Sequence, residues 1–286
     1  MTYPTTHPAT WFVTGASRGL GLELVRQILD RGDNVTATSR SAERLVAALD
    51  GSDTSRLLAL EVDLRDEQAV SAAITATIER FGDLDVVVNN AGYGFLAAVE
   101  EVTDAQARDM FDVQLFGAWN VLRSALPTFR AKRSGHIINV SSIVGLVAFP
   151  GWGLYAAGKF AIEGLSASLA GEVAGLGIDV TIVEPGYLRT DFLKPVSLGV
   201  ASTEIEGYEA IREMTAAHQA MPGTQLGDPV RAAAAIVDVA VSGAAPLHQL
   251  LGSDSYAIAT GALKGLAEEF EAGHARAITT DIPGVN

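Results

Sequence analysis

Residues 13–24, VTGASRGLGLEL, place three glycines where an apolar run gives way to a helical pattern. Gly15, Gly19 and Gly21 have the spacing G-x-x-x-G-x-G. Glycines here permit a tight turn and let backbone N–H groups approach a pyrophosphate, whose charge the N-terminus of the following helix favours. A turn that only lets strand and helix pack closely would have the same composition. The position of these three glycines directly after a first apolar strand favours phosphate binding.

Short apolar runs alternate with helix-length segments along most of the chain. The runs are TWFVTG (10–15), NVTATS (34–39), RLLALEVD (56–63), LDVVVNN (84–90), HIINVSS (136–142) and IDVTIVEP (178–185). The helices between them are predicted at about 19–31, 41–50, 66–80, 104–130 and 153–176. Runs that are apolar on both faces suit a parallel sheet covered by helices. The sequence therefore predicts an α/β fold with a doubly wound parallel sheet of about seven strands.

The pattern changes in the C-terminal third. Residues 187–227 form an insertion with one predicted helix near 204–220, and another helix follows Asp228, its predicted N-cap. The last strand is predicted within 248–253, the last helix at 254–272 and a tail at 273–286. No linker or repeat divides the chain, so we expect residues 1–286 to form a single domain.

The composition of the 286 residues excludes several classes of function. Hydrophobic residues make up 48% and charged residues 19%, which supports a large core. The net charge of -14 argues against a nucleic-acid binder, and the absence of cysteine excludes disulfides and thiolate metal sites, so we expect no metal. Neither a signal peptide nor a membrane span is predicted, which makes a cytoplasmic protein the expectation.

The end of the second strand, TATSR, indicates which cofactor to expect. An NAD site usually has a carboxylate there for the ribose 2′-hydroxyl, whereas this chain has Ser39 and Arg40. Arg18, in the glycine turn, approaches the same point. Two guanidinium groups and a hydroxyl suit a 2′-phosphate and favour NADP(H). The alternative is a pair of solvated surface arginines.

A tyrosine and a lysine stand four residues apart in YAAGK, residues 155–159. In a helix they lie one turn apart on the same face, with only small residues between them. A free phenol titrates near pH ~10, and a cation one turn away favours the phenolate. We therefore expect Lys159 to lower the pKa of Tyr155. Without further motifs, a tyrosine at the end of a core helix and a solvated lysine would be the simpler interpretation.

Several motifs together resemble the short-chain dehydrogenase/reductase family over about residues 10–195. They are T-G-x-x-x-G-x-G at 14–21, NNAG at 89–92, Ser142 thirteen residues before Y-x-x-x-K, and PG at 185–186 followed by Thr190. The resemblance implies a Rossmann-type fold with helices on both faces. It also implies that Tyr155 is the acid that protonates a carbonyl oxygen, or the base of the reverse oxidation. Lys159 would hold the nicotinamide ribose, and Ser142 would hydrogen-bond the substrate oxygen.

The resemblance extends to the other cofactor contacts. Asp63, with Leu64, matches the acidic position that contacts adenine, although Asp63 is equally well placed as N-cap of the helix at 66–80. The expected cofactor-binding residues are Gly15, Ser17, Arg18, Gly19, Leu20, Gly21, Ser39, Arg40, Asp63, Leu64, Asn90, Ala91, Gly92, Tyr155, Lys159, Pro185, Gly186, Leu188 and Thr190.

One catalytic position departs from the family pattern. Gln114 stands three residues before Gly117, where the family usually has the asparagine of N-x-x-G. That asparagine holds a water that links the lysine to solvent. Gln114 either holds the water from a shifted position, which we favour, or displaces it and bonds the lysine or a backbone group directly.

The residues expected around the reacting carbon are apolar or aromatic, which suits a lipophilic ketone or secondary alcohol. They are Tyr93, Phe95, Phe149, Trp152, Tyr187 and Phe192, with Leu146 and Met214 as further candidates. Several of them could instead pack the loop on the sheet. The sequence thus predicts an NADP(H)-dependent oxidoreductase. The alternatives are a non-catalytic sensor on the same fold and a redox isomerase or dehydratase of sugar nucleotides, which the lack of a nucleotide-sugar subdomain disfavours.

Family members commonly pair through the helices that correspond to 104–130 and 153–176, so we expect a homodimer or homotetramer. The second helix contains Ala161, Gly164, Ala167, Ser168 and Gly171, which would permit close approach of another helix. Close packing of these small residues on the protein's own sheet is the alternative.

Overall fold

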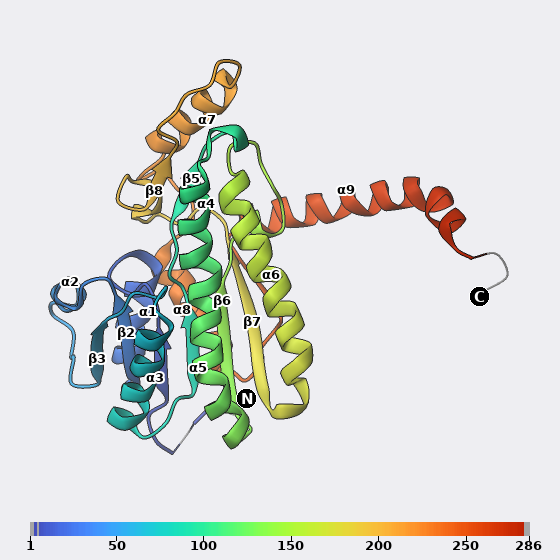
Figure 1. Cartoon of the computed structure of the whole chain (residues 1–286). Helices are drawn as coiled ribbons and strands as arrows, with labels where there is room; N and C mark the ends of the chain where they lie inside the picture. Colours follow the sequence, from blue (N-terminus) through green and yellow to red (C-terminus); the bar gives the residue numbers. More distant parts are fainter. Residues whose placement is uncertain (1–2, 5, 283–286) are drawn as a thin grey trace.

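The computed structural model describes residues 3–4 and 6–282, and a parallel sheet stands at its centre (Figure 1). The strands of this sheet are β1 (Thr10–Val13), β2 (Asn34–Ser39), β3 (Leu57–Glu61), β4 (Val86–Asn89), β6 (Gly135–Val140), β7 (Ile178–Pro185) and β9 (His248–Leu251). They lie in the order β3-β2-β1-β4-β6-β7-β9, and every neighbouring pair is parallel. The predicted seven-stranded, doubly wound α/β fold is confirmed.

Helices cover both faces of the sheet (Figure 1). They are α1 (Gly19–Asp30), α2 (Ala42–Ala48), α3 (Glu67–Phe81), α4 (Asp104–Phe111), α5 (Gly117–Lys132), α6 (Gly153–Val173), α7 (Glu209–Ala220), α8 (Pro229–Val241) and α9 (Ser253–Ala277). One core packs α1 and α8 on the sheet, and the other packs α3, α5 and α6. Strand β1 shows why the runs are apolar throughout, because Trp11 and Val13 enter the first core and Phe12 enters the second. In the described part of the chain, none of these helices has the length and apolarity of a membrane span.

The segment predicted as one helix at 104–130 is interrupted. Between α4 and α5 lies a π-helical turn, η2 (Asp112–Phe116), which buries Gln114. A π turn inserts an extra residue into the helix and re-aims the side chains around it. The spacing of apolar residues does not reveal such an insertion, so the prediction of one regular helix is wrong here.

The C-terminal third also differs from the prediction. A two-stranded parallel sheet, β5 (Gly94–Leu96) with β8 (Leu198–Val200), was not predicted, because three-residue strands leave no periodic signal. Helix α7 begins at Glu209, later than the expected 204, and α9 continues to Ala277. The first residues of the predicted tail are therefore helical, and its end, 283–286, lies outside the described residues.

The glycine turn between β1 and α1 is fixed by neighbouring backbone. Gly15 and Gly19 have φ values of +67° and +55°, which favour glycine. The Asn90 amide donates to the carbonyls of Thr14 and Gly15 at 2.9 and 3.2 Å. A Cβ on Gly21 would lie 2.5 Å from the Gly15 carbonyl oxygen and 2.5 Å from Asn90 Nδ2. The turn therefore has no room for a side chain at residue 21.

Gly21→Ala is expected to lower the free energy of unfolding by about 1–3 kcal/mol, because the new methyl group must displace backbone. Gly261→Ala, in exposed helix α9, is the matched control. A Cβ there meets nothing within 4 Å. This control should raise the free energy of unfolding by about 0.5–1 kcal/mol, since alanine favours the helix. Urea denaturation of both variants measures the difference, and a Gly21→Ala protein as stable as the wild type would contradict the account.

Candidate active site

A cavity of about 1330 Å³ opens where the strands β1, β2, β4, β6 and β7 end. This is the edge at which doubly wound sheets bind ligands. Every residue expected to bind the cofactor lines this cavity. Thr190 also closes against the glycine turn, because a Cβ on Gly19 would lie 3.5 Å from Thr190 Cβ. The topology thus brings together the distant segments that the sequence singled out.

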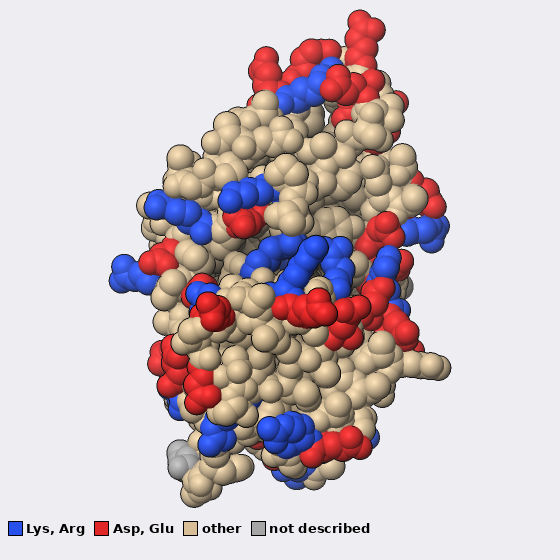
Figure 2. All heavy atoms as spheres, turned by 90° about the vertical axis from the view of Figure 1, so that its left-hand side faces the viewer, with Lys and Arg blue, Asp and Glu red and all other residues tan. Residues whose placement is uncertain are grey.

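Arginines mark one end of the cavity. On the face shown in Figure 2, Lys and Arg side chains gather across the middle of the surface. Arg18, Arg40, Arg44 and Arg65 all line the cavity. Burial, and then the nearby Arg40 guanidinium, hold the pKa of Arg18 below its ordinary value. Arg18 and Arg40 are thus close enough to repel each other, and a bound anion would relieve that repulsion.

Two residues near the arginines have different partners from those expected. The Ser39 hydroxyl donates to the Ser41 carbonyl at 2.6 Å, so its proton is already used in the turn. Asp63 forms a two-pronged ion pair with Arg65, which holds the pKa of Asp63 below its ordinary value. Asp66, and not Asp63, caps α3 by accepting from Gln68 and Ala69. The N-cap alternative for Asp63 is therefore wrong.

Arg44 and Arg65 were not singled out from the sequence, because no motif contains them.

Tyr155 lies at the start of α6, beside the serine that follows β6. Tyr155 is 5% exposed, and its ring packs against Trp152 and Phe192, at centroid distances of 5.5 and 5.6 Å. Burial raises the pKa of Tyr155, and a hydrogen bond with the Ser142 side chain opposes this only in part. The expected lowering by Lys159 is not found. A buried phenol without a contacting charge holds its proton more tightly than one in water.

Lys159 is 5% exposed, and its ammonium donates to the carbonyl of Val140 at 2.8 Å. This ammonium lies 5.6 Å from the centre of the Tyr155 ring. Burial lowers the pKa of Lys159 to about 8, although Glu163, one turn further along α6, opposes the shift. Between these two groups, it is therefore the lysine that titrates nearest neutral pH.

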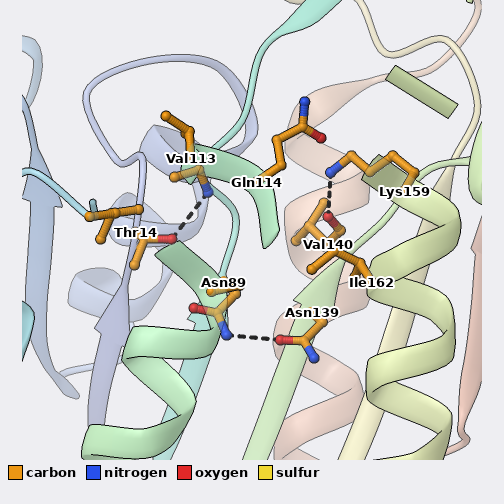
Figure 3. Close-up of a pocket in the computed structure, with 11 residues that line it drawn as sticks. Thr14, Asn89, Val113, Gln114, Asn139, Val140, Lys159 and Ile162 are labelled. Atoms are coloured by element: carbon orange, nitrogen blue, oxygen red, sulfur yellow. Dashed lines mark hydrogen bonds between the residues drawn. The ribbon is translucent and has the colours of Figure 1, made fainter. Parts of the chain in front are cut away.

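Gln114 faces a second, small cavity of about 10 Å³ between η2 and α6 (Figure 3). Its amide nitrogen donates to the carbonyl of Tyr93 at 2.8 Å. Its oxygen is buried and has no hydrogen-bond partner among the described residues. Lys159 lines the same small cavity, and Figure 3 shows its ammonium group on the side of the Gln114 amide. The amide nitrogen thus bonds a backbone group directly, which is part of the second expected outcome. The amide oxygen is left free to hold a water, which is the first expected outcome.

Aromatic side chains also line the large cavity, and one of them, Tyr93, lies near Arg40 and Arg65. Of the expected residues, Tyr93, Phe149, Trp152, Tyr187 and Phe192 line it, and Met214 joins them. Phe95 does not, because it is 6% exposed and packs in the core against Gly199 of β8. Leu146 packs against the same core. His218 of α7 lines the cavity and was not anticipated, because the sequence does not show where the insertion folds back.

The residues present fit a nicotinamide dinucleotide. The first turn of α1 contains no acidic residue, and Arg18 at its N-cap makes no capping hydrogen bond with its side chain. The N–H groups of this turn therefore remain available to an anion, which helix N-termini favour. The paired arginines lie at one end of the cavity, and Tyr155 and Lys159 line it as well.

Comparisons with known proteins agree with this site. Residues 9–200 match the short chain dehydrogenase family. The chain is 36% identical over 246 residues to the oxidoreductase BOA17 of Botryotinia fuckeliana. The aligned region covers 86% of this chain and 89% of that protein. It is also 35% identical over 189 residues to the 3-oxoacyl-(acyl-carrier-protein) reductase FabG of Staphylococcus aureus. That aligned region covers 65% of this chain and 76% of the reductase.

A solved structure agrees over nearly the whole length. The crystal structure of a short-chain dehydrogenase from Streptomyces avermitilis has a TM-score of 0.88 and 33% identity, and the match covers 97% of this chain and 100% of that one. With its Rossmann-type sheet, glycine turn and cavity, the chain is an oxidoreductase that belongs to the short-chain dehydrogenase/reductase family.

Proposed function

We propose that this oxidoreductase uses NADP(H) to interconvert an apolar ketone or aldehyde and the corresponding alcohol. The observation that carries the proposal is the placement of Ser142, Tyr155 and Lys159 on one cavity that arginines and aromatic rings also line. A non-catalytic sensor would not need a buried acid beside a buried ammonium, so we do not favour that alternative.

The cofactor supplies a hydride to the carbonyl carbon when bound, and this chain's own residues handle the proton. Tyr155 is protonated at neutral pH, as an ordinary phenol is, and can donate its proton to the carbonyl oxygen. Burial raises the pKa of Tyr155 and so opposes this donation, which makes a nearby positive charge necessary. The Ser142 hydroxyl hydrogen-bonds Tyr155 and would hold the same oxygen in place. Lys159, with a pKa of about 8, carries a positive charge that stabilises the phenolate left behind.

Gln114 is placed to help return a proton to the site. The small cavity beside it has about the volume that one water needs, and such a water requires polar partners. The free oxygen of Gln114 and the ammonium of Lys159 are an acceptor and a donor on that cavity. We therefore assign Gln114 the part of the family asparagine, with its amide nitrogen fixed to the Tyr93 carbonyl.

Preference for NADP(H) over NAD(H) is supported by charge at the arginine end. Arg18 and Arg40 lie close enough to repel each other, and no carboxylate follows β2 at Ser39 or Arg40 to receive a ribose hydroxyl. A 2′-phosphate would place about two negative charges between the guanidinium groups. NAD(H) would leave their repulsion uncompensated.

A panel of apolar ketones and aldehydes, assayed for oxidation of NADPH and NADH, tests the function and the cofactor together. NADPH is expected to give the higher kcat/KM. Arg40→Ala should reduce this preference at least tenfold, because it removes one charged partner worth about 1.5–3 kcal/mol. Arg231→Ala, an exposed arginine of α8 outside the cavity, is the control. Equal kcat/KM for the two cofactors, or an unchanged preference in Arg40→Ala, would refute the NADP(H) assignment.

We also propose that the protein is a homodimer or homotetramer that pairs through α5 and α6. Gly164 and Gly171 of α6 face outward, because a Cβ on either meets nothing within 4 Å. Packing of these glycines on the protein's own sheet is therefore wrong. Trp119 and Phe160 are 43% and 45% exposed on the same two helices. A second copy would cover these apolar side chains.

Helix α9 supports self-association as well. It projects away from the sheet (Figure 1), and its apolar side chains remain exposed. Leu263, Leu266 and Phe270 follow each other at spacings of three and four, which places them along one stripe. An isolated helix of this kind is only marginally stable in water, so packing against a partner would stabilise it.

Light scattering is expected to give at least twice the chain mass of 29.9 kDa. Phe160→Glu should shift the mass towards the monomer, because it places a charge on the proposed apolar interface. Val46→Glu, at a 48% exposed position of α2 on the other side of the sheet, is the matched control and should keep the wild-type mass. A wild-type mass of 29.9 kDa at micromolar concentration would overturn the assembly.

A further inference from the structure

A pair of polar side chains interrupts the aromatic end of the large cavity. The Tyr187 hydroxyl lies 2.9 Å from Nε2 of His218, and both residues line the cavity. Tyr187 follows β7, and its backbone N–H donates to Asp254 at 2.8 Å, which fixes the start of the loop. His218 comes from α7, so the insertion at 187–227 brings this polar group to the site.

The hydrogen bonds of His218 determine which atom donates. Nδ1 of His218 lies 2.8 Å from the carbonyl oxygen of Met214, which can only accept. Nδ1 therefore carries the proton, and Nε2 of the neutral ring is an acceptor. The Tyr187 hydroxyl must donate to Nε2, so its proton is already used. Only its lone pairs remain, and they can only accept a hydrogen bond.

This acceptor lies a short way from the acid. Trp152 contacts both Tyr155 and His218, with ring centres 5.5 and 5.2 Å apart, so the His218 ring lies within about 11 Å of the Tyr155 ring. Tyr187 in turn contacts His218, with ring centres 5.8 Å apart. Phe192 and Met214, which line the same cavity, are apolar, whereas Trp152 also carries an indole N–H. An unpaired polar group on a bound ligand would therefore be costly here.

We propose that Tyr187 and His218 form a subsite for a hydrogen-bond donor on the substrate, so that the preferred carbonyl compounds carry a hydroxyl group at the end remote from the reacting carbon. This inference rests on the proposed carbonyl–alcohol activity. A remote hydroxyl would donate to the Tyr187 oxygen. An ether or carbonyl oxygen has no proton to donate, so its lone pairs would repel those of the Tyr187 oxygen. For Tyr187 to donate to such a ligand it must leave Nε2 of His218 without a partner. The pair therefore discriminates by hydrogen-bond direction and not by size.

Benzylacetone, its para-hydroxy derivative and its para-methoxy derivative are suitable probes. The methoxy compound matches the hydroxy compound in shape but cannot donate. Binding is measured by calorimetry, with the protein saturated with oxidised cofactor so that no ketone is turned over. The same compounds are then assayed for kcat and KM with reduced cofactor.

The wild type is expected to bind the hydroxy compound about tenfold more tightly than the methoxy compound, the scale of one hydrogen bond. The difference should appear in KM and not in kcat. Tyr187→Phe should bring the ratio of the two affinities close to one, and His218→Leu should lower it because Tyr187 is then free to donate. Tyr256→Phe, at a 63% exposed tyrosine of α9, makes the same chemical change away from the cavity and should keep the wild-type ratio.

Equal affinities in the wild type, or a preference that survives Tyr187→Phe, would overturn the subsite. Absence of turnover with all three ketones and with the wider panel would instead contradict the proposed activity. The affinity ratios do not depend on turnover, so the two failures are distinguishable.

Discussion

The buried hydrogen bond from the Lys159 ammonium to the Val140 carbonyl is the contact on which the site depends. An ammonium group removed from water is costly unless it is paired, and this bond ties α6 to the end of β6 at 2.8 Å. Tyr155, one turn earlier on α6, is thereby held beside Ser142, which follows the same strand. Burial also lowers the pKa of Lys159 to about 8, so this ammonium group titrates close to neutral pH.

The large cavity combines charged and aromatic side chains. The protein carries a net charge of -14, yet four arginines line one end of the cavity. Local guanidinium groups can therefore hold an anion against the overall field, because screening limits distant charges more than near ones. Among the aromatic side chains, Tyr187 donates to His218, so only the lone pairs of the Tyr187 oxygen remain for a ligand.

Local patterns in the sequence predicted much of the fold and of the cavity. The glycine turn, the apolar strands and the spacing of Tyr155 and Lys159 depend on neighbouring residues, so they can be read from short segments. The π turn at Gln114 and the strands β5 and β8 leave no such pattern. The pKa of Tyr155 depends on burial, to which Phe192 contributes from a distant part of the sequence, and this explains why the direction of the shift was predicted wrongly. Arg65 and His218 reach the cavity only through tertiary structure.

The central claim is that Tyr155 is the acid of a carbonyl reduction, and the Tyr155→Phe variant tests it most directly. Phenylalanine preserves the ring contacts with Trp152 and Phe192 and removes only the hydroxyl. The account predicts that kcat for ketone reduction falls by about 10²–10⁴-fold, the usual contribution of a general acid, while the dissociation constant of NADPH stays within about threefold of the wild type. A Phe variant that retains the wild-type kcat would contradict it.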